Sequence, residues 1–193
     1  MSDMAVLSPY RFTVADYHRI AESGALDDAR VELIDGIIVE MSPIGPVHVN
    51  LHALIVADLS RLLSEVATVV GQGSFPFGDR NEPQPDVAIV AKIDRAALDR
   101  QTTPDQIFAI VEIANTSFAT DSGPKARLYG RFGIADYLIV DLNENALLHY
   151  TEPHALGYRQ IMRLSQGDTF HFARFPQIRI EAAAFLPPPS RKG

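Results

Sequence analysis

Two apolar segments, each carrying one acidic residue, constrain the fold of this sequence more than any other feature. Asp86 comes directly before the apolar run 87–90, and Glu112 follows the apolar run 107–111. Apolar runs of this length are typical of strands that are buried on both faces of an α/β sheet. A carboxylate buried there loses its hydration, which is costly unless a cation or hydrogen-bond donors replace the water. The sequence therefore predicts a central sheet with two acidic side chains inside it.

Two readings of these acids are open from the sequence. If the two strands are neighbours and both carboxylates point the same way, Asp86 and Glu112 supply oxygen ligands of the kind that Mg²⁺ or Mn²⁺ prefers. Alternatively, Asp86 only caps the turn after Pro85 and Glu112 meets a structural arginine, because ordinary ion pairs also bury acids. The metal-site reading predicts that the two side chains lie close together on adjacent strands.

The composition is that of one folded domain. The chain has 193 residues, of which 47% are hydrophobic, so we expect residues 1–186 to form a single domain and the tail 187–193 to be disordered. The lack of cysteine excludes disulfides, thiolate metal sites and cysteine nucleophiles. Residues 1–10 do not read as a secretory signal, and no apolar stretch reaches the roughly 18 residues of a membrane span. A cytoplasmic protein without a membrane association is expected.

The charge is unevenly distributed along the chain. The formal net charge is −7, and residues 1–100 hold 15 acidic and 8 basic residues, whereas residues 101–193 hold 9 of each. Proteins that bind nucleic acid through its phosphates usually present a basic surface. The acidic half therefore counts against tight, non-specific DNA binding. It does not exclude a local groove, for which Lys92, Arg127 and Arg131 are the candidates.

Turn signals predict two hairpins. Asp35-Gly36 lies between two apolar segments and predicts an N-terminal hairpin over residues 30–41. A second, C-terminal hairpin is expected over residues 146–164. Further strands are expected at 67–71 and 136–141, and the polar segment 92–106 reads as a long connection.

Two longer helices are expected between these strands. Pro46 is a typical first residue of a helix, and apolar positions continue at helical spacing to about residue 66. Pro124, with Ser122 as its cap, is expected to open the second helix, which Gly133 closes. Together with the apolar strands, these elements predict an α/β (α+β) domain whose mixed central sheet is flanked by helices.

Lys125 is the third candidate site residue. In a helix that begins at Pro124 it lies in the first turn, where the helix dipole favours acids over cations. It also shares a face with the apolar residues Leu128 and Tyr129. A lysine in that position needs an anionic partner, and Glu112 is the natural candidate. The alternative is a lysine whose stem packs while its ammonium reaches water.

Two other residues are weaker candidates. Glu32 interrupts the apolar strand of the first hairpin, so it either supplies a third carboxylate or points outward from a half-buried hairpin. His48, in the first turn after Pro46, could ligate a metal or contact a phosphate. A capped histidine at the surface is the favoured reading, because His48 and His52 flank the apolar stripe of their helix.

Several short segments of the chain, in their order, resemble a known family. They are Val31-Glu32-Leu33-Ile34-Asp35-Gly36, Met41-Ser42-Pro43 with His48, Pro85-Asp86-Val87, Ile110-Val111-Glu112-Ile113, the helix residues Asp121, Lys125 and Tyr129, and the segment 133–141. This set resembles the Uma-type endonucleases of bacteria, in the PD-(D/E)XK nuclease superfamily. The resemblance runs from about residue 10 to residue 158. Its specificity lies in the ordered set rather than in any single motif.

The resemblance implies a restriction endonuclease-like core and a set of roles. Asp86 and Glu112 would bind Mg²⁺, Lys125 would be the catalytic lysine, and Glu32 would be an accessory acid. One departure affects the lysine. In the superfamily it usually stands two residues after the second acid, where this chain has Ala114, so Lys125 has to reach the site from the helix.

The expected function is therefore metal-dependent hydrolysis of phosphodiester bonds in nucleic acid. DNA is the expected substrate, and cleavage of two strands would favour a homodimer. The alternative is a catalytically silent member of the fold that serves as a binding or assembly module. The acidic first half and the displaced lysine favour that module, whereas the set Asp86, Glu112 and Lys125 favours the enzyme. Similarity of fold does not decide between them.

Overall fold

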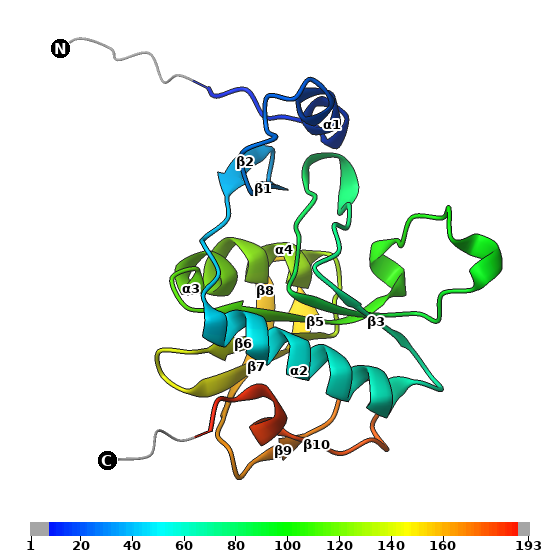
Figure 1. The fold of residues 1–193 in the computed structure, drawn as a ribbon, viewed down its shortest axis with the longest axis vertical. Helices are drawn as coiled ribbons and strands as arrows, with labels where there is room; N and C mark the ends of the chain where they lie inside the picture. Colours follow the sequence, from blue (N-terminus) through cyan, green and yellow to red (C-terminus); the bar gives the residue numbers. More distant parts are fainter. Residues whose placement is uncertain (1–7, 189–193) are drawn as a thin grey trace.

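A mixed β-sheet forms the centre of the computed structural model, which describes residues 8–188 (Figure 1). The spatial order is β3-β4-β5-β6-β7-β8. Neighbours β5 and β6 run parallel, and the other neighbouring pairs are antiparallel. The strands are β3 (Thr68–Gly71), β4 (Val87–Val90), β5 (Ile107–Ala114), β6 (Asp136–Asp141), β7 (Ala146–His154) and β8 (Gly157–Leu164). The expected mixed sheet is confirmed, and the C-terminal hairpin β7–β8 is part of it.

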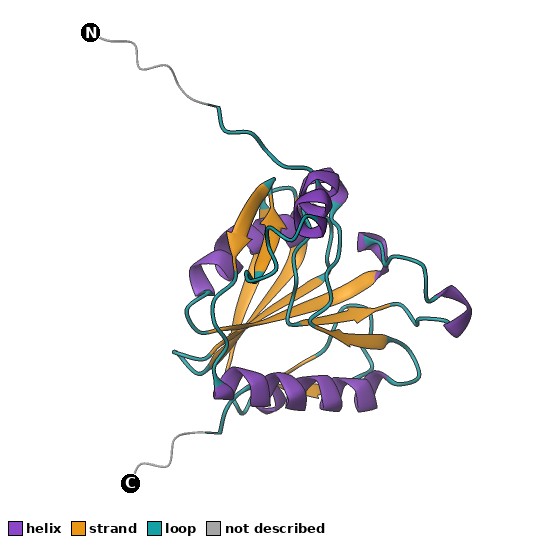
Figure 2. Ribbon diagram, turned by 45° about the horizontal axis from the view of Figure 1, so that its top comes forward, coloured by secondary structure: helices purple, strands orange, loops and turns teal. Residues whose placement is uncertain are grey.

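Helix α2 (Pro46–Leu63) covers one face of the sheet (Figure 2). It begins at Pro46, as expected, because a proline at the first position lacks only an N–H that would have no partner in the helix. The buried positions Leu51, Ile55, Leu59 and Leu63 recur every four residues and pack against the sheet. Other apolar residues of the predicted stripe, including Leu54 and Leu62, are exposed, so the stripe is narrower than the sequence indicated.

The C-terminal segment packs against the same face as α2. It contains the short strands β9 (Thr169–Phe170) and β10 (Ile180–Glu181), which pair with each other, and the 3-10 helix η5 (Ala182–Phe185). Its aromatic residues join the core formed by α2 and the sheet. Part of the predicted tail, residues 189–193, lies outside the described residues.

The opposite face of the sheet is covered by a helical segment of three parts. These are α3 (Phe118–Thr120), the π-helical turn η4 (Asp121–Lys125) and α4 (Ala126–Arg131). The prediction that this helix begins at Pro124 was wrong, because Pro124 lies inside the π turn. Ser122 does not cap the helix either; its hydroxyl donates to the Phe118 carbonyl. The buried rings of Tyr129 and Tyr137 pack edge to face between α4 and the sheet.

The N-terminal elements gather on the side of the sheet away from α2 (Figure 2). They are α1 (Val14–Glu22), β1 (Val31–Ile34) and β2 (Ile37–Glu40). Thr13 and Asp16 form a capping box at the start of α1. The expected hairpin β1–β2 is confirmed, with Asp35 and Gly36 at positive φ in its turn. A β-bridge between Leu33 and Glu82 joins this hairpin to the loop that leads into β4.

Two other connections are irregular. The loop between β3 and β4 contains the 3-10 helix η1 (Gly78–Arg80). The polar connection after β4 contains the 3-10 helices η2 (Arg95–Ala97) and η3 (Pro104–Gln106) and projects from the body of the protein (Figure 1). No helix within residues 8–188 is long and apolar enough to cross a membrane.

Candidate active site at the β4–β5 pair

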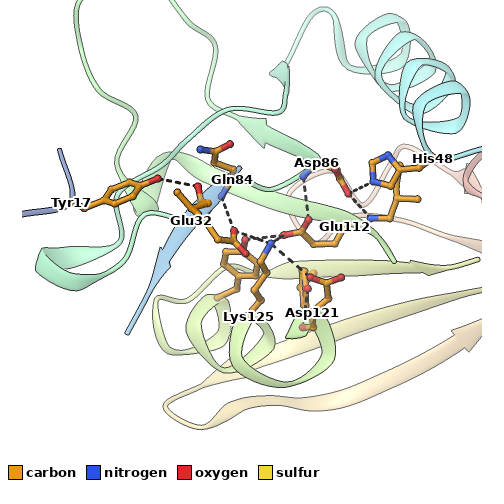
Figure 3. Close-up of polar contacts among 12 residues, drawn as sticks. Tyr17, Glu32, His48, Gln84, Asp86, Glu112, Asp121 and Lys125 are labelled. Atoms are coloured by element: carbon orange, nitrogen blue, oxygen red, sulfur yellow. Dashed lines mark hydrogen bonds and ion pairs between the residues drawn. The ribbon is translucent and has the colours of Figure 1, made fainter. Parts of the chain in front are cut away.

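Asp86, which comes directly before β4, lies beside Glu112 on the neighbouring strand β5. Strands β4 and β5 are antiparallel with Val87 opposite Val111, and one further step along this register brings Asp86 opposite Glu112. The Asp86 N–H donates to Glu112 Oε2 over 3.2 Å, and the Ile113 N–H donates to Asp86 Oδ2 over 2.7 Å. The two carboxylates lie close together in Figure 3. The predicted adjacency is confirmed.

Lys125 points into this cluster. Its Nζ lies 3.0 Å from Glu112 Oε1, 3.0 Å from Glu32 Oε2 and 3.7 Å from Asp121 Oδ1 (Figure 3). The residue is only 4% exposed, so the reading in which its ammonium reaches water was wrong. Glu112 therefore meets a lysine, and the alternative of a structural arginine was wrong as well.

Lys125 occupies a different place in its helical segment from the one predicted. Lys125 is the last residue of the π turn η4, in the middle of a helical segment, and not in the first turn of a helix. Pro124 has no N–H to donate within the helix, and the Ala126 N–H instead bonds to the Asp121 carbonyl, five residues earlier. The widened turn places Asp121 and Lys125 together on the buried side.

Glu32 completes the cluster from the N-terminal hairpin. The residue is 3% exposed, so the reading in which it points outward was wrong. Its Oε2 accepts the Gln84 N–H over 3.1 Å besides facing Lys125. The hairpin β1–β2 thus brings a third carboxylate to the two that approach Lys125 from β5 and η4.

His48 lies at the other side of Asp86. Its Nε2 is 3.1 Å from Asp86 Oδ2, and the residue is 7% exposed, so the expectation of a surface histidine was wrong. One turn later, His52 Nε2 lies 2.9 Å from the main-chain oxygen of Asp86. The start of α2 is thereby fixed to the residue that precedes β4.

Two further site residues had been noted only as part of the helix pattern. Asp121, four residues before Lys125, is 3% exposed and faces its ammonium. Tyr129, four residues after Lys125, is fully buried and donates its hydroxyl to Glu112 Oε1 over 3.1 Å. Spacing by four residues was a usable signal for both, because it places side chains on one side of a helical segment.

Burial and an excess of acids control the protonation of the cluster. Burial raises the pKa of Glu112 well above its usual range; the Lys125 ammonium opposes this rise, and Asp121 and Asp86 add to it. Burial likewise raises the pKa of Asp121. Burial alone would lower the pKa of Lys125, but the surrounding carboxylates of Glu112, Glu32 and Asp121 outweigh it, so the net pKa is raised. Lys125 therefore stays protonated at neutral pH.

The cluster lines a pocket. Its other walls come from residues 41–44, after β2, and from residues 115–117 and Thr120, after β5. Among the lining residues the cations are Arg30 and Lys125, and the acids are Glu32, Glu40, Asp86, Glu112 and Asp121. The pocket thus carries an excess of negative charge.

A divalent cation of the Mg²⁺ type fits this chemistry. Such ions take oxygen ligands, keep several waters and are commonly held by one or two carboxylates. Asp86 and Glu112 are the residues that would hold one, and the surplus of carboxylates over ammonium groups favours an added positive charge. A site in which the protein alone supplies all the metal ligands would need more converging side chains. Within residues 8–188 no three His, Asp or Glu side chains converge as a metal cage requires.

The three basic residues considered for a phosphate groove do not form one beside the pocket. Lys92 follows the far end of β4 and donates to the Ser64 carbonyl. Arg131 pairs with Asp35 on the N-terminal hairpin over 2.7 Å. Arg127 is exposed but does not line the pocket.

The mixed sheet, with Asp86 directly before β4, Glu112 on β5 and a lysine that reaches Glu112 from the helical segment, defines a restriction endonuclease-like α/β fold. The sequence profile of the Uma2 family, described as "Putative restriction endonuclease", matches residues 14–183. The chain therefore belongs to the Uma2 family.

A solved structure shares the fold. It is described as a crystal structure of "a putative nuclease belonging to DUF820 from Anabaena variabilis ATCC 29413" and is 14% identical in sequence. The match has a TM-score of 0.64 and covers 82% of this chain and 90% of the other. A search of curated proteins gives no match. At this level of identity, the structural likeness establishes the fold and leaves the activity to be argued from the site.

Proposed function

We propose that this protein is a metal-dependent nuclease that hydrolyses phosphodiester bonds in nucleic acid, with DNA as the expected substrate. One observation carries the proposal. The paired carboxylates of Asp86 and Glu112 and the buried ammonium of Lys125 meet in one pocket, with Lys125 Nζ 3.0 Å from Glu112 Oε1. Membership of a family described as "Putative restriction endonuclease" supports the same reaction class.

The proposed roles follow from the chemistry of the side chains. When bound by Asp86 and Glu112, Mg²⁺ or Mn²⁺ would act as a Lewis acid toward a phosphate oxygen. Lys125 holds its proton, so its role is to offset negative charge in the transition state rather than to act as a base. Its ammonium has three N–H groups, of which two face Glu112 and Glu32 at 3.0 Å. The third remains for a phosphate oxygen or a water.

Glu32 and Asp121 serve the lysine in this scheme. Glu32 fixes the ammonium from the side of the N-terminal hairpin, and Asp121, at 3.7 Å, lies beyond a direct hydrogen bond to it. The accessory role proposed for Glu32 is therefore to orient Lys125. Glu112 accepts hydrogen bonds from both Lys125 and Tyr129, and these two contacts fix the ammonium beside the acid pair Asp86 and Glu112.

A catalytically silent binding module is the second candidate. The charge of the pocket favours it, because five acidic residues and two cations line the walls, which repels an unaccompanied phosphate. The two candidates differ in what a divalent cation would do. In the nuclease it neutralises the acids and permits cleavage, whereas the silent module leaves nucleic acid intact with any cation.

A two-fold dimer, as cleavage of both strands would favour, is part of the nuclease proposal.

A cleavage assay separates the candidates. Purified protein is incubated with plasmid DNA, single-stranded DNA and folded RNA in the presence of Mg²⁺, Mn²⁺ or a chelator. We expect cleavage with the cations, loss of cleavage in Glu112→Gln, and normal cleavage in Glu144→Gln, a matched change at a residue paired with Arg163 on the surface. Cleavage that survives Glu112→Gln indicates a contaminant, and a wild type that cleaves nothing with either cation supports the silent module.

A further inference from the structure

The proposed function leaves His48 without a role, although its ring contacts the candidate ligand Asp86. The two oxygens of the Asp86 carboxylate differ in their partners. Oδ2 accepts the Ile113 N–H over 2.7 Å and lies 3.1 Å from His48 Nε2. Within residues 8–188, Oδ1 has no hydrogen-bond donor. The carboxylate is thus held through one oxygen, and the other is left free.

The second ring nitrogen of His48 indicates which tautomer makes this contact. His48 Nδ1 is buried and has no hydrogen-bond partner among the described residues. A proton on Nδ1 would therefore be a buried donor without an acceptor, while a bare Nε2 would face a carboxylate oxygen. The opposite tautomer, with the proton on Nε2, gives Asp86 Oδ2 a second donor. The contact is then a hydrogen bond from His48 to Asp86.

We propose that His48 is a positioning residue, which holds Asp86 Oδ2 so that Oδ1 is presented as the ligand for a divalent cation. The proposal rests on the proposed function, because it assumes that Asp86 binds the cation. Carboxylates that bind metals are themselves commonly fixed by hydrogen bonds, and loss of such a partner weakens metal affinity. The Ile113 N–H provides one hydrogen bond to Oδ2, and the imidazole fixes the rotation of the carboxylate with the second.

His52 provides a matched control. It lies one turn after His48 on α2, and its Nε2 contacts the same residue, but at the main-chain oxygen of Asp86. If the two histidines only attach α2 to the strand, replacing either should have a similar effect. If His48 positions the carboxylate, its replacement alone should weaken binding of the cation.

The test measures the affinity of metal-free protein for Mn²⁺ by titration calorimetry. We expect His48→Ala to weaken binding by about 10- to 100-fold and His52→Ala to leave it unchanged. In His48→Gln the amide nitrogen stands the same number of bonds from the main chain as Nε2 does, so most of the affinity should return. In His48→Asn the side chain is one bond shorter, and the affinity should stay low. If His48→Ala does not fold, the difference in Mn²⁺ affinity between His48→Gln and His48→Asn still tests the proposal.

A spectroscopic measurement tests the hydrogen bond without the cation. The ¹⁵N chemical shifts of the His48 ring in metal-free protein should report a bare Nδ1 and a protonated Nε2. The opposite tautomer would overturn the proposal, as would equal Mn²⁺ affinity in wild type and His48→Ala, or an equal loss in His52→Ala. A wild type that binds no Mn²⁺ would overturn both this inference and the metal-dependent function. Binding that is insensitive to His48 overturns the inference alone.

Discussion

The protein buries ionisable side chains on both faces of its sheet, and the two clusters are built differently. On the face covered by α2, His149 Nε2 lies 2.7 Å from Asp136 Oδ1, and the Ala173 N–H donates to Asp136 Oδ2 over 2.8 Å. That cluster contains one acid and one histidine, and it is not part of the pocket. On the other face, Glu32, Glu112 and Asp121 surround the single cation Lys125 and line the pocket.

The two clusters show what distinguishes a buried pair that stabilises the fold from a candidate site. The Asp136–His149 pair joins β6 and β7 to the C-terminal segment, and within the described residues each Asp136 oxygen has a donor from the protein itself. The Lys125 cluster has three carboxylates around one cation and stands beside a pocket through which a ligand can enter. A buried carboxylate whose oxygens both have donors from the protein is explained by the fold. A buried excess of one charge calls for something that the fold alone does not supply.

The largest expected effect is on activity. Lys125→Met should reduce nucleic acid cleavage by at least about 100-fold, because a charge aimed at the transition state is removed. Lys125→Met also removes the cation that three acids share, which would weaken the fold. Lys125→Arg is therefore used as a companion variant. It keeps the charge but changes its geometry, and it should also be impaired. His149→Gln, which retains a donor toward Asp136, should cleave normally. Equal losses in the Lys125 and His149 variants would remove the distinction between the two faces.

The next effect is on stability. His149→Ala leaves Asp136 buried with only a main-chain donor, and we expect the free energy of unfolding to fall by about 3–5 kcal/mol. Urea denaturation followed by circular dichroism measures this change. Because the pair lies outside the pocket, Mn²⁺ affinity of the folded variant should equal that of wild type. A loss of Mn²⁺ affinity would show that both faces belong to one site.

A divalent cation should stabilise the folded protein. At a concentration of 100 times its Kd, a bound cation adds about 2.7 kcal/mol to the free energy of unfolding, which for a chain of this size raises Tm by roughly 5–10 °C. Differential scanning calorimetry with and without Mn²⁺ measures the shift. Asp86→Asn should abolish it, and Asp136→Asn should preserve it. A shift that persists in Asp86→Asn would place the cation elsewhere.

The smallest expected effect is a dependence of stability on pH. The pKa of Glu112 is raised in the folded state above its ordinary value of 4.5 because the residue is buried. The folded protein therefore binds the proton more tightly than the unfolded chain does. The stabilisation is complete below the unfolded pKa and is lost as the pH rises through the folded pKa.

The contribution of Glu112 can be isolated by substitution. In metal-free protein, ionisation of Glu112 should lower the free energy of unfolding by no more than about 1.4 kcal/mol for each pH unit above pH 4.5. Denaturation of wild type and Glu112→Gln across this range should show the decline in wild type and a flatter profile in the variant. Parallel profiles would mean that Glu112 ionises in the folded protein as easily as in the unfolded chain.

Patterns along single segments of the sequence were sufficient to predict the central part of the fold and of the site. Two apolar runs with one acid each predicted that Asp86 and Glu112 would be neighbours, because strands buried on both faces must lie inside a sheet. Lys125 was assigned the correct partner for a partly wrong reason. The placement of Pro124 at a helix start, which would put the lysine at the positive end of a helix, was overruled by the π turn.

Residues that enter the site through distant contacts were not predictable from local patterns. Glu32 lies on a separate hairpin, and only the packing of that hairpin onto the loop before β4 buries it. His48 flanks the apolar stripe of α2 and is buried because the first turn of the helix reaches Asp86. Both positions depend on how elements meet in space, which hydrophobic periodicity along one element does not encode.

The π turn also determines how the lysine must be located in related sequences. A regular α-helix rotates by about 100° for each residue, and a π turn absorbs one extra residue without rotating the side chains that follow it out of place. Deleting a single residue between Phe118 and Lys125 would therefore restore a regular helix and leave the lysine directed at Glu112. The number of residues that separates the lysine from the second acid is therefore not a reliable guide to homologous positions. Alignments of such chains are better anchored on the local winding of the helix than on a fixed interval.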